Sequence, residues 1–402
     1  MDCFSHSHFY FYYQEIAMIR IHALKLSFIF CCYLIQIPVV YAQCNLQYLA
    51  KVIPVISIKG KTQRIASVAI SPNGNYLLSA GKGKIIWLWN LQTGRLIRRF
   101  FGHRDIISSV NFSSDGKYAI SGSRDRTIRL WNVNTGKLLK TYTGHRGFVS
   151  SVQFFSYDRY ILSSAYDRTI GWWNKGSKKL IYKFKKGSWV LSLDISPNER
   201  FMIAGNRDRK MRLWNLKTAK VQRTFKAYSY FISVAFSPNG KYIVSGHSNR
   251  SVRLWDVKTG RMLHNFHGHD DSVFSVDISP DNSQIVSASW DKTVRVWDIK
   301  SRKLSRIFRG HVGDVYSVKF SSNGKRIISA GDDGIFIWDT KTGSQIAHLI
   351  SFKDGEWITV TPNGAFTASN KGTKNILISN RQVRNDNYYH CPDVVKKALT
   401  EE

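Results

Sequence analysis

The stretch from Gly102 to Asn132 reads GHRDIISSVNFSSDGKYAISGSRDRTIRLWN, and recognisable copies of it recur along most of the chain. Its penultimate residue, a tryptophan, recurs along the chain at intervals of 41 or 42 residues. The seven copies are Trp89, Trp131, Trp173, Trp214, Trp255, Trp297 and Trp338. A period this constant indicates a repeat architecture.

Each repeat is typical of short strands joined by tight turns. Apolar residues alternate with polar ones, as at Ile128 and Leu130, which is the period of a strand with one buried face. The turn SPNG at 71–74 has eight copies, of which the last is TPNG at 361–364. Such turns combine a side-chain acceptor, the fixed φ of proline and a residue that tolerates left-handed geometry. The pattern predicts an all-β fold of four-stranded antiparallel blades arranged radially.

The units resemble WD40 repeats, with Gly-His near the start and Trp-Asp or Trp-Asn near the end, over roughly residues 50 to 380. In that family a His, a Ser or Thr, an Asp and the Trp form a hydrogen-bonded tetrad inside each blade. The resemblance implies four such tetrads here, all structural. They are His103, Ser121, Asp125, Trp131; His145, Ser163, Asp167, Trp173; His269, Ser287, Asp291, Trp297; and His311, Ser329, Asp333, Trp338.

Three units depart from this pattern. The fourth has Ala204 at the Ser position, the fifth has Asn249 at the Asp position and Ala227 at the His position, and the first keeps Ser79 and Trp89. Because buried polar networks stabilise most when every member is satisfied, the fourth and fifth blades are expected to be the softer ones.

The blade count rests on the last turn copy. Glu356 to Asn380 supplies three further strands without the His or Trp-Asp, and Val52 to Lys59 supplies one isolated strand. In this family the N-terminal strand completes the last blade, so the sequence favours eight blades closed by that strand. The alternative is a seven-bladed ring with an appended C-terminal hairpin. The predicted units lie near 50–90, 91–132, 133–174, 175–215, 216–256, 257–298, 299–339 and 340–380, within a propeller domain at 43–380 and before a polar tail at 381–402.

Residues 1–42 form a different kind of sequence. An apolar run from Leu26 to Val40 follows basic residues and ends at the small residue Ala42. A run of this length is shorter than a spanning helix and is typical of a secretory signal peptide. We therefore predict a secreted or periplasmic protein with no membrane span after cleavage, the alternative being an uncleaved signal anchor. Translation starting at Met18 instead of Met1 is left open.

Two cysteines, Cys44 and Cys391, would remain after cleavage, just outside the first and last predicted strands. In an oxidising compartment they are candidates for a disulfide that latches the ring, against the alternative of two free thiols in the tails.

The chain is strongly basic, with 59 Lys and Arg against 27 Asp and Glu and a net charge of +32. Such a surface attracts acidic proteins, anionic lipid or acidic polysaccharide, whereas an exported protein rarely meets nucleic acid. The alternative is that the charge serves solubility alone. We expect no cofactor and no metal, because phosphate-binding loops and zinc motifs are missing from the sequence.

The His, Ser and Asp residues also match a hydrolase triad in composition, but a catalytic site would occur once and these sets recur in register. No catalytic residue is therefore predicted, and the chain is expected to be a non-catalytic scaffold that binds another protein through one propeller face. In this family that face carries the residue third after the His and the residue before the Asp. Aromatic and arginine residues, which anchor interfaces most often, occupy these positions in the middle units. The predicted partner-binding residues are Arg124, Phe148, Tyr166, Trp189, Arg207, Tyr230 and Trp290. An anion receptor or an enzyme at the channel mouth is the competing function.

Overall fold

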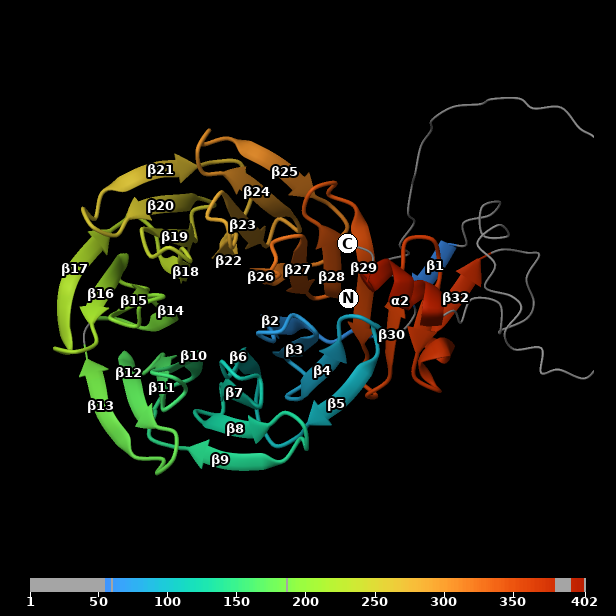
Figure 1. Cartoon of the computed structure of the whole chain (residues 1–402), viewed down its shortest axis with the longest axis horizontal. Helices are drawn as coiled ribbons and strands as arrows, with labels where there is room; N and C mark the ends of the chain where they lie inside the picture. The colour runs from blue at the N-terminus through green and yellow to red at the C-terminus, as the bar shows by residue number, and fades with distance from the viewer. Residues whose placement is uncertain (1–54, 59–60, 186, 380–391, 401–402) are drawn as a thin grey trace, which may run out of the picture. The chain divides into compact units, whose positions relative to one another are not determined.

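The computed structural model describes residues 55–58, 61–185, 187–379 and 392–400. Its core is a ring of seven antiparallel blades, in each of which four consecutive strands run from the central channel to the rim, and the sheet of the seventh blade has two further strands (Figure 1). The strands of the first four blades are β2 Ile65–Ile70, β3 Tyr76–Gly81, β4 Ile86–Asn90, β5 Leu96–Phe100; β6 Ile107–Phe112, β7 Tyr118–Ser123, β8 Ile128–Asn132, β9 Leu138–Tyr142; β10 Val149–Phe155, β11 Tyr160–Ala165, β12 Thr169–Asn174, β13 Leu180–Lys185; and β14 Val190–Ile195, β15 Phe201–Asn206, β16 Lys210–Asn215, β17 Lys220–Lys226.

The remaining three blades follow the same order. Their strands are β18 Phe231–Phe236, β19 Tyr242–His247, β20 Val252–Asp256, β21 Met262–Phe266; β22 Val273–Ile278, β23 Gln284–Ser289, β24 Val294–Asp298, β25 Leu304–Phe308; and β26 Val315–Phe320, β27 Arg326–Gly331, β28 Gly334–Asp339, β29 Gln345–Ser351. The core lies between neighbouring blades, where the apolar faces of adjacent sheets meet and the repeat tryptophans are buried.

In six of the seven blades the serine of an SPNG-like turn holds the first two strands together. In the second blade the Tyr118 amide donates to Ser113 Oγ at 2.9 Å, and that hydroxyl donates to Asp115 Oδ1 at 2.6 Å. Gly116 then takes a φ of 69°, in the left-handed region that glycine adopts without steric cost. The sequence of the turn thus sets the register of the hairpin.

A belt of serines on the innermost strands links each blade to the next around the channel. At six of the seven seams a serine Oγ accepts a hydrogen bond from a valine amide of the neighbouring blade, at 3.1–3.2 Å. The serines are Ser67, Ser109, Ser192, Ser233, Ser275 and Ser317. At the last seam Ser317 Oγ accepts from the Val68 amide, so the seventh blade packs directly on the first. The ring is therefore closed with seven blades.

The predicted eight-bladed ring is wrong. The eighth unit does not enter the circle, because β30 Trp357–Val360 and β31 Phe366–Ala368 extend the seventh blade into a six-stranded sheet. The isolated strand near the N-terminus, β1 Val55–Ile58, pairs with β32 Ile376–Ser379 in a separate two-stranded sheet and so does not complete a blade of the ring. The alternative of seven blades with an appended hairpin has the right blade count.

A physical reason for this outcome is visible at the serine belt. The belt serine precedes the turn serine by four residues in most units, as Ser317 precedes Ser321, and the eighth unit has Trp357 at this position. An indole is too large for the inner wall and cannot accept the hydrogen bond of a neighbouring blade. Trp357 instead packs edge-on against Trp89 of the first blade, with ring centroids 6.0 Å apart.

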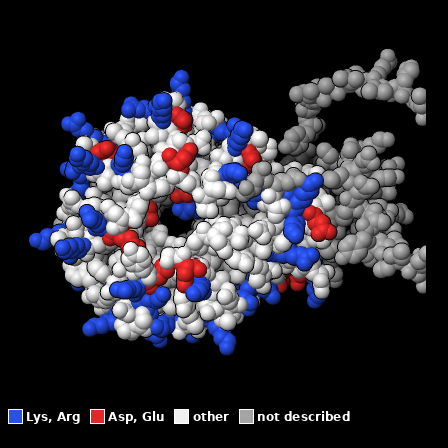
Figure 2. Space-filling model, in the orientation of Figure 1, with Lys and Arg blue, Asp and Glu red and all other residues white. Residues whose placement is uncertain are grey.

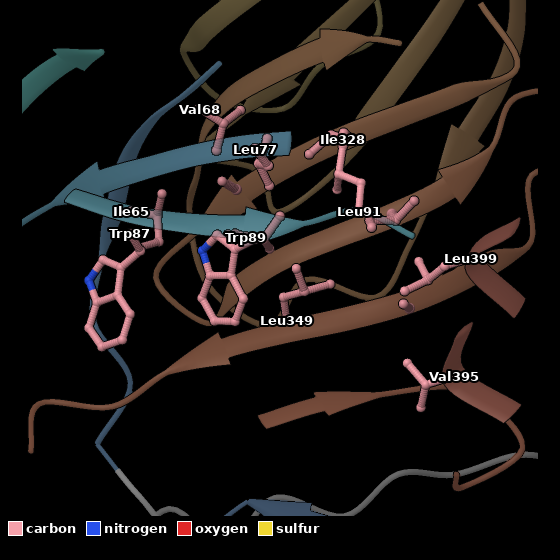
Figure 3. Close-up of a cluster of buried hydrophobic side chains, with 14 of the residues drawn as sticks. Ile65, Val68, Leu77, Trp87, Trp89, Leu91, Ile328, Leu349, Val395 and Leu399 are labelled. Atoms are coloured by element: carbon pink, nitrogen blue, oxygen red, sulfur yellow. The ribbon is translucent and has the colours of Figure 1, made fainter. Parts of the chain in front are cut away.

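The C-terminal extension covers the seam between the seventh and first blades. Thr359 Oγ1 donates to the Gly94 carbonyl at 2.6 Å, and the helix α2 Pro392–Thr400 buries Val395 and Leu399. These two side chains belong to the same apolar cluster as Trp89 and Leu349, as Figure 3 shows. Part of the segment described from the sequence only as a polar tail is thus a helix that packs on the propeller.

Several predictions concern residues outside the described part of the chain. The signal peptide at 1–42 and the pairing of Cys44 with Cys391 belong to this group and remain predictions. Within the described ranges, none of the helices has the length and apolar character needed to cross a bilayer.

Candidate interaction face

The complete tetrads form one hydrogen-bonded chain in each of four blades. In the second blade His103 Nδ1 lies 2.7 Å from Asp125 Oδ2, and His103 Nε2 lies 2.7 Å from Ser121 Oγ. Trp131 Nε1 donates to the same hydroxyl at 2.8 Å. The third, sixth and seventh blades repeat these contacts through Ser163, Ser287 and Ser329. Each tetrad therefore joins the entry loop of its blade to the second and third strands.

The electrostatics of the tetrad suit a structural role. Burial raises the pKa of Asp125, but hydrogen bonds from His103 and Thr127 outweigh it and hold that pKa well below its usual range. Burial also lowers the pKa of His103, more than the neighbouring carboxylate raises it. The imidazole is therefore neutral near pH 7. Ser121 is fully buried beneath the indole of Trp131, where a substrate has no access to its hydroxyl.

The fourth blade lacks this chain. With Ala204 at the serine position, Trp214 Nε1 has no hydrogen-bond partner among the described residues, and Asn206 Oδ1 is likewise unpartnered there. Asp208, which would accept from the missing histidine, instead pairs with Arg212 at 2.5 Å. The expectation of an incomplete network in this blade agrees with the geometry.

The fifth blade differs from the expectation, because His247, on the same strand as the tetrad serine, replaces the missing histidine of the entry loop. Trp255 Nε1 donates to Ser245 Oγ at 2.8 Å, and that oxygen lies 2.8 Å from His247 Nε2. His247 Nδ1 then lies 3.0 Å from Ser229 Oγ, which donates to Asn249 Oδ1 at 3.0 Å. Burial lowers the pKa of His247 to about 3, so the ring is neutral. A histidine two residues after the tetrad serine was the sequence signal for this network.

Aromatic rings and arginines form a continuous stack around one side of the channel mouth. Tyr166 lies parallel to Trp189, with centroids 5.0 Å apart, and Phe148 contacts Tyr166 at 6.0 Å. The Arg207 guanidinium lies 4.4 Å from the Trp189 ring and 5.4 Å from the Tyr230 ring. Arg124 lies 5.7 Å from Phe148 at the other end. We call this set, Arg124, Phe148, Tyr166, Trp189, Arg207 and Tyr230, the mouth arc.

The mouth arc crosses four blades, from the second to the fifth. Its residues stand directly before the inner strands β10, β14 and β18 or in the hairpin loops after β7, β11 and β15. Arg124 and Arg207 are exposed, and within the described chain neither forms an ion pair with a carboxylate. Six of the seven predicted partner-binding residues thus come together.

Trp290, the seventh predicted residue, lies in a different cluster. It stacks on Phe274 with centroids 4.2 Å apart, and Tyr316 packs edge-on against both rings. Arg64 covers Tyr316 at 4.8 Å and pairs with Asp332 at 2.6 Å. Because that arginine is neutralised by a carboxylate, this second cluster presents less positive charge than the mouth arc. The sequence analysis missed Phe274 and Tyr316, which alternate with belt residues on the inner strands.

Both clusters line the central channel, a cavity of about 1000 Å³. Deeper in the channel, Lys319 pairs with Asp277 at 3.2 Å, and the Phe236 amide donates to Asp194 at 2.8 Å. The enclosing wall desolvates Asp194 and raises its pKa to about 6. In the described ranges no group of three His, Cys, Asp or Glu is placed to hold a metal ion. The mouth thus presents stacked aromatic rings together with the exposed guanidinium groups of Arg124 and Arg207.

Comparison with known families agrees with the geometry. Residues 53–90, 94–132 and 302–339 match the WD domain, G-beta repeat. Residues 126–307 match the family described as the IFT122 first beta-propeller. The chain is a WD40-repeat protein. WD40 propellers are generally non-catalytic scaffolds for protein interaction, and this WD40 ring has complete tetrads in four of its blades. No individual curated protein matches the chain.

Proposed function

We propose that this WD40 protein is a non-catalytic scaffold that holds a protein partner at the mouth arc. The observation that carries the proposal is the unbroken stack from Arg124 through Trp189 to Tyr230. Tryptophan, tyrosine and arginine dominate the binding energy of protein interfaces, above all where they border a desolvated pocket. The mouth arc combines all three beside a cavity of about 1000 Å³.

The stack also lowers the entropic cost of binding. A guanidinium held between Trp189 and Tyr230 has already lost much of its rotamer freedom, so less is lost when a partner binds. Because Arg124 and Arg207 have no acidic partner within the described chain, a carboxylate of the bound protein can pair with either. The proposed partner is therefore an acidic protein segment with apolar side chains for the cavity.

The similarity to the IFT122 first propeller favours a setting for this scaffold. We propose that its partners are subunits of a multiprotein assembly of the intraflagellar transport kind. The matched residues 126–307 cover the whole of the mouth arc except Arg124.

Export through the predicted signal peptide is a separate proposal, and the mass of the mature chain distinguishes cleavage after Ala42 from an intact N-terminus.

The test is capture of partners from the source cell by wild type and by a Trp189→Ala, Tyr230→Ala variant. Loss of two anchors should weaken a genuine partner at least about thirtyfold, the effect of about 2 kcal/mol. The matched control is Trp290→Ala, an aromatic of the second cluster that is more exposed than Trp189 and Tyr230 and should leave the capture intact. Equal capture by wild type and the double variant contradicts the proposal, and equal loss in the control shows that the arc is not the site.

A further inference from the structure

The positive charge of the protein is concentrated on one side of the ring. Residues 168–255, from the third to the fifth blade, hold nineteen Lys and Arg against three acids. Residues 256–339, from the end of β20 in the fifth blade to the end of β28 in the seventh, hold twelve Lys and Arg against eleven acids. A charge that served solubility alone would have no reason to be missing from the sixth and seventh blades.

Exposed lysines on the outer strands of the second to fourth blades account for much of this asymmetry. Figure 2 shows basic side chains projecting around the rim of the propeller. The outer strands β9, β13 and β17 and the turns before them contain no acid. Exposed here are Lys137, Lys178, Lys179, Lys185, Lys217, Lys220 and Lys226, with Leu138, Leu139, Ile181 and Tyr182 between them. We call this set the lysine wall.

The turns show that the missing acids are not required by the fold. In the third blade Asn174 Oδ1 accepts from the Ser177 amide at 2.8 Å, and in the sixth Asp298 Oδ1 accepts from the Ser301 amide at 2.6 Å. Either residue therefore builds the same turn. Asn occupies this place in the first four blades and Asp in the last three. The blades that carry the lysine wall therefore have a neutral residue where the turn would also accept a negatively charged one.

The wall is continuous between the second and third blades. Lys140 Nζ of β9 donates to the Lys175 carbonyl at 3.0 Å and also contacts the Gly176 carbonyl, both in the turn before β13. Leu138, Leu139, Ile181 and Tyr182 each keep two-fifths or more of their surface exposed. Apolar side chains and lysines thus share one strip of the rim.

We propose that the lysine wall binds the surface of an anionic lipid membrane. Its chemistry differs from that of the mouth arc, where arginines and stacked rings border a cavity. A bilayer surface needs no pocket, because lysines reach the phosphate layer on flexible stems while leucine, isoleucine and tyrosine enter the boundary beneath it. Each lysine close to such a surface strengthens binding by about 1 kcal/mol, or about fivefold.

The test is co-sedimentation of the full chain with phosphatidylcholine vesicles that contain or lack phosphatidylserine. Wild type should sediment with the anionic vesicles alone. A Lys179→Glu, Lys185→Glu, Lys220→Glu variant should bind at least about a hundredfold more weakly, because three attractive charges become repulsive. The matched control is Lys300→Glu, Lys303→Glu, Lys341→Glu, which makes the same charge change at exposed positions of the sixth and seventh blades and should keep binding within about threefold, since exposed charges beyond a Debye length are screened.

A Leu139→Ser, Ile181→Ser variant keeps the charge and removes the apolar contribution, so it should lose about tenfold. Thermal melts must show that all variants remain folded. Failure of wild type to bind the anionic vesicles overturns the proposal, as does equal loss in the wall and control variants. If wild type ignores vesicles but binds polyglutamate through the wall lysines, the wall is a protein-docking surface and not a membrane one.

Discussion

The sixth and fourth blades have the same strand order and turn geometry, yet they solve the burial of their tryptophan differently. In the sixth, Trp297 donates to Ser287, which also contacts His269, so these polar groups of the tetrad all have hydrogen-bond partners. In the fourth, the indole of Trp214 is buried without a partner among the described residues. The fourth blade also supplies Trp189 and Arg207 to the mouth arc. The blade at the centre of the proposed binding face is therefore the one with the least complete internal network.

The largest expected effect comes from breaking the complete blade. Ser287→Ala removes the atom that pairs with both Trp297 Nε1 and His269 Nε2 and leaves two buried polar groups unsatisfied. The free energy of unfolding should fall by about 3 kcal/mol in a denaturant titration. The corresponding change in the fourth blade already exists, since Ala204 is native there. A loss below about 0.5 kcal/mol would mean that the tetrad does not distinguish the two blades.

The fifth blade lies between these extremes and allows a test by pH. The pKa of His247 is about 3 in the folded state because of burial, against about 6.5 in an unfolded chain. The unfolded state therefore binds more protons between these values, so stability is complete above pH 6.5 and declines as the pH falls toward 3. His247 alone should contribute a slope of up to about 1.4 kcal/mol per pH unit.

Replacing His247 with glutamine removes that titration. The unfolding free energy of the variant, measured from pH 7 to pH 4, should decline less steeply than that of wild type. Both proteins retain the other buried histidines, such as His103 and His269, whose pKa values burial also lowers. Parallel slopes in the two proteins would show that His247 is not held neutral by the fold.

The smallest expected effect comes from repairing the fourth blade. Ala204→Ser places a hydroxyl where Ser287 stands in the sixth blade, so that Trp214 Nε1 gains an acceptor. The unfolding free energy should rise by about 1 kcal/mol, the net worth of one hydrogen bond. The control is Ala288→Ser, beside an already complete tetrad, which should stabilise nothing because Ala288 is fully buried in an apolar cluster. Destabilisation by Ala204→Ser would show that Trp214 is not short of a partner.

The sequence predicted the repeat, the tetrads and the side chains of the mouth arc because these features recur at a fixed spacing. It failed on the blade count because a turn such as TPNG at 361–364 forms a hairpin whether or not that hairpin enters a ring. The sequence feature that distinguishes the eighth unit from the seven blades is Trp357, which stands where most units have a belt serine. His247 was overlooked because the family pattern places the tetrad histidine in the entry loop, whereas here it stands two residues after Ser245 and reaches Ser229 across the blade.

Hydrogen exchange of the native protein tests the central claim most directly, because it reads the fourth and sixth blades in one experiment. Amides of β15 and β16 should exchange faster than those of β23 and β24. Local opening of the fourth blade breaks fewer side-chain hydrogen bonds than opening of the sixth, so it costs less free energy. A captured partner should slow exchange in the segments that carry Trp189, Arg207 and Tyr230 and leave the sixth blade unchanged. Equal exchange in the two blades, with protection by the partner centred on Trp290, would contradict the account.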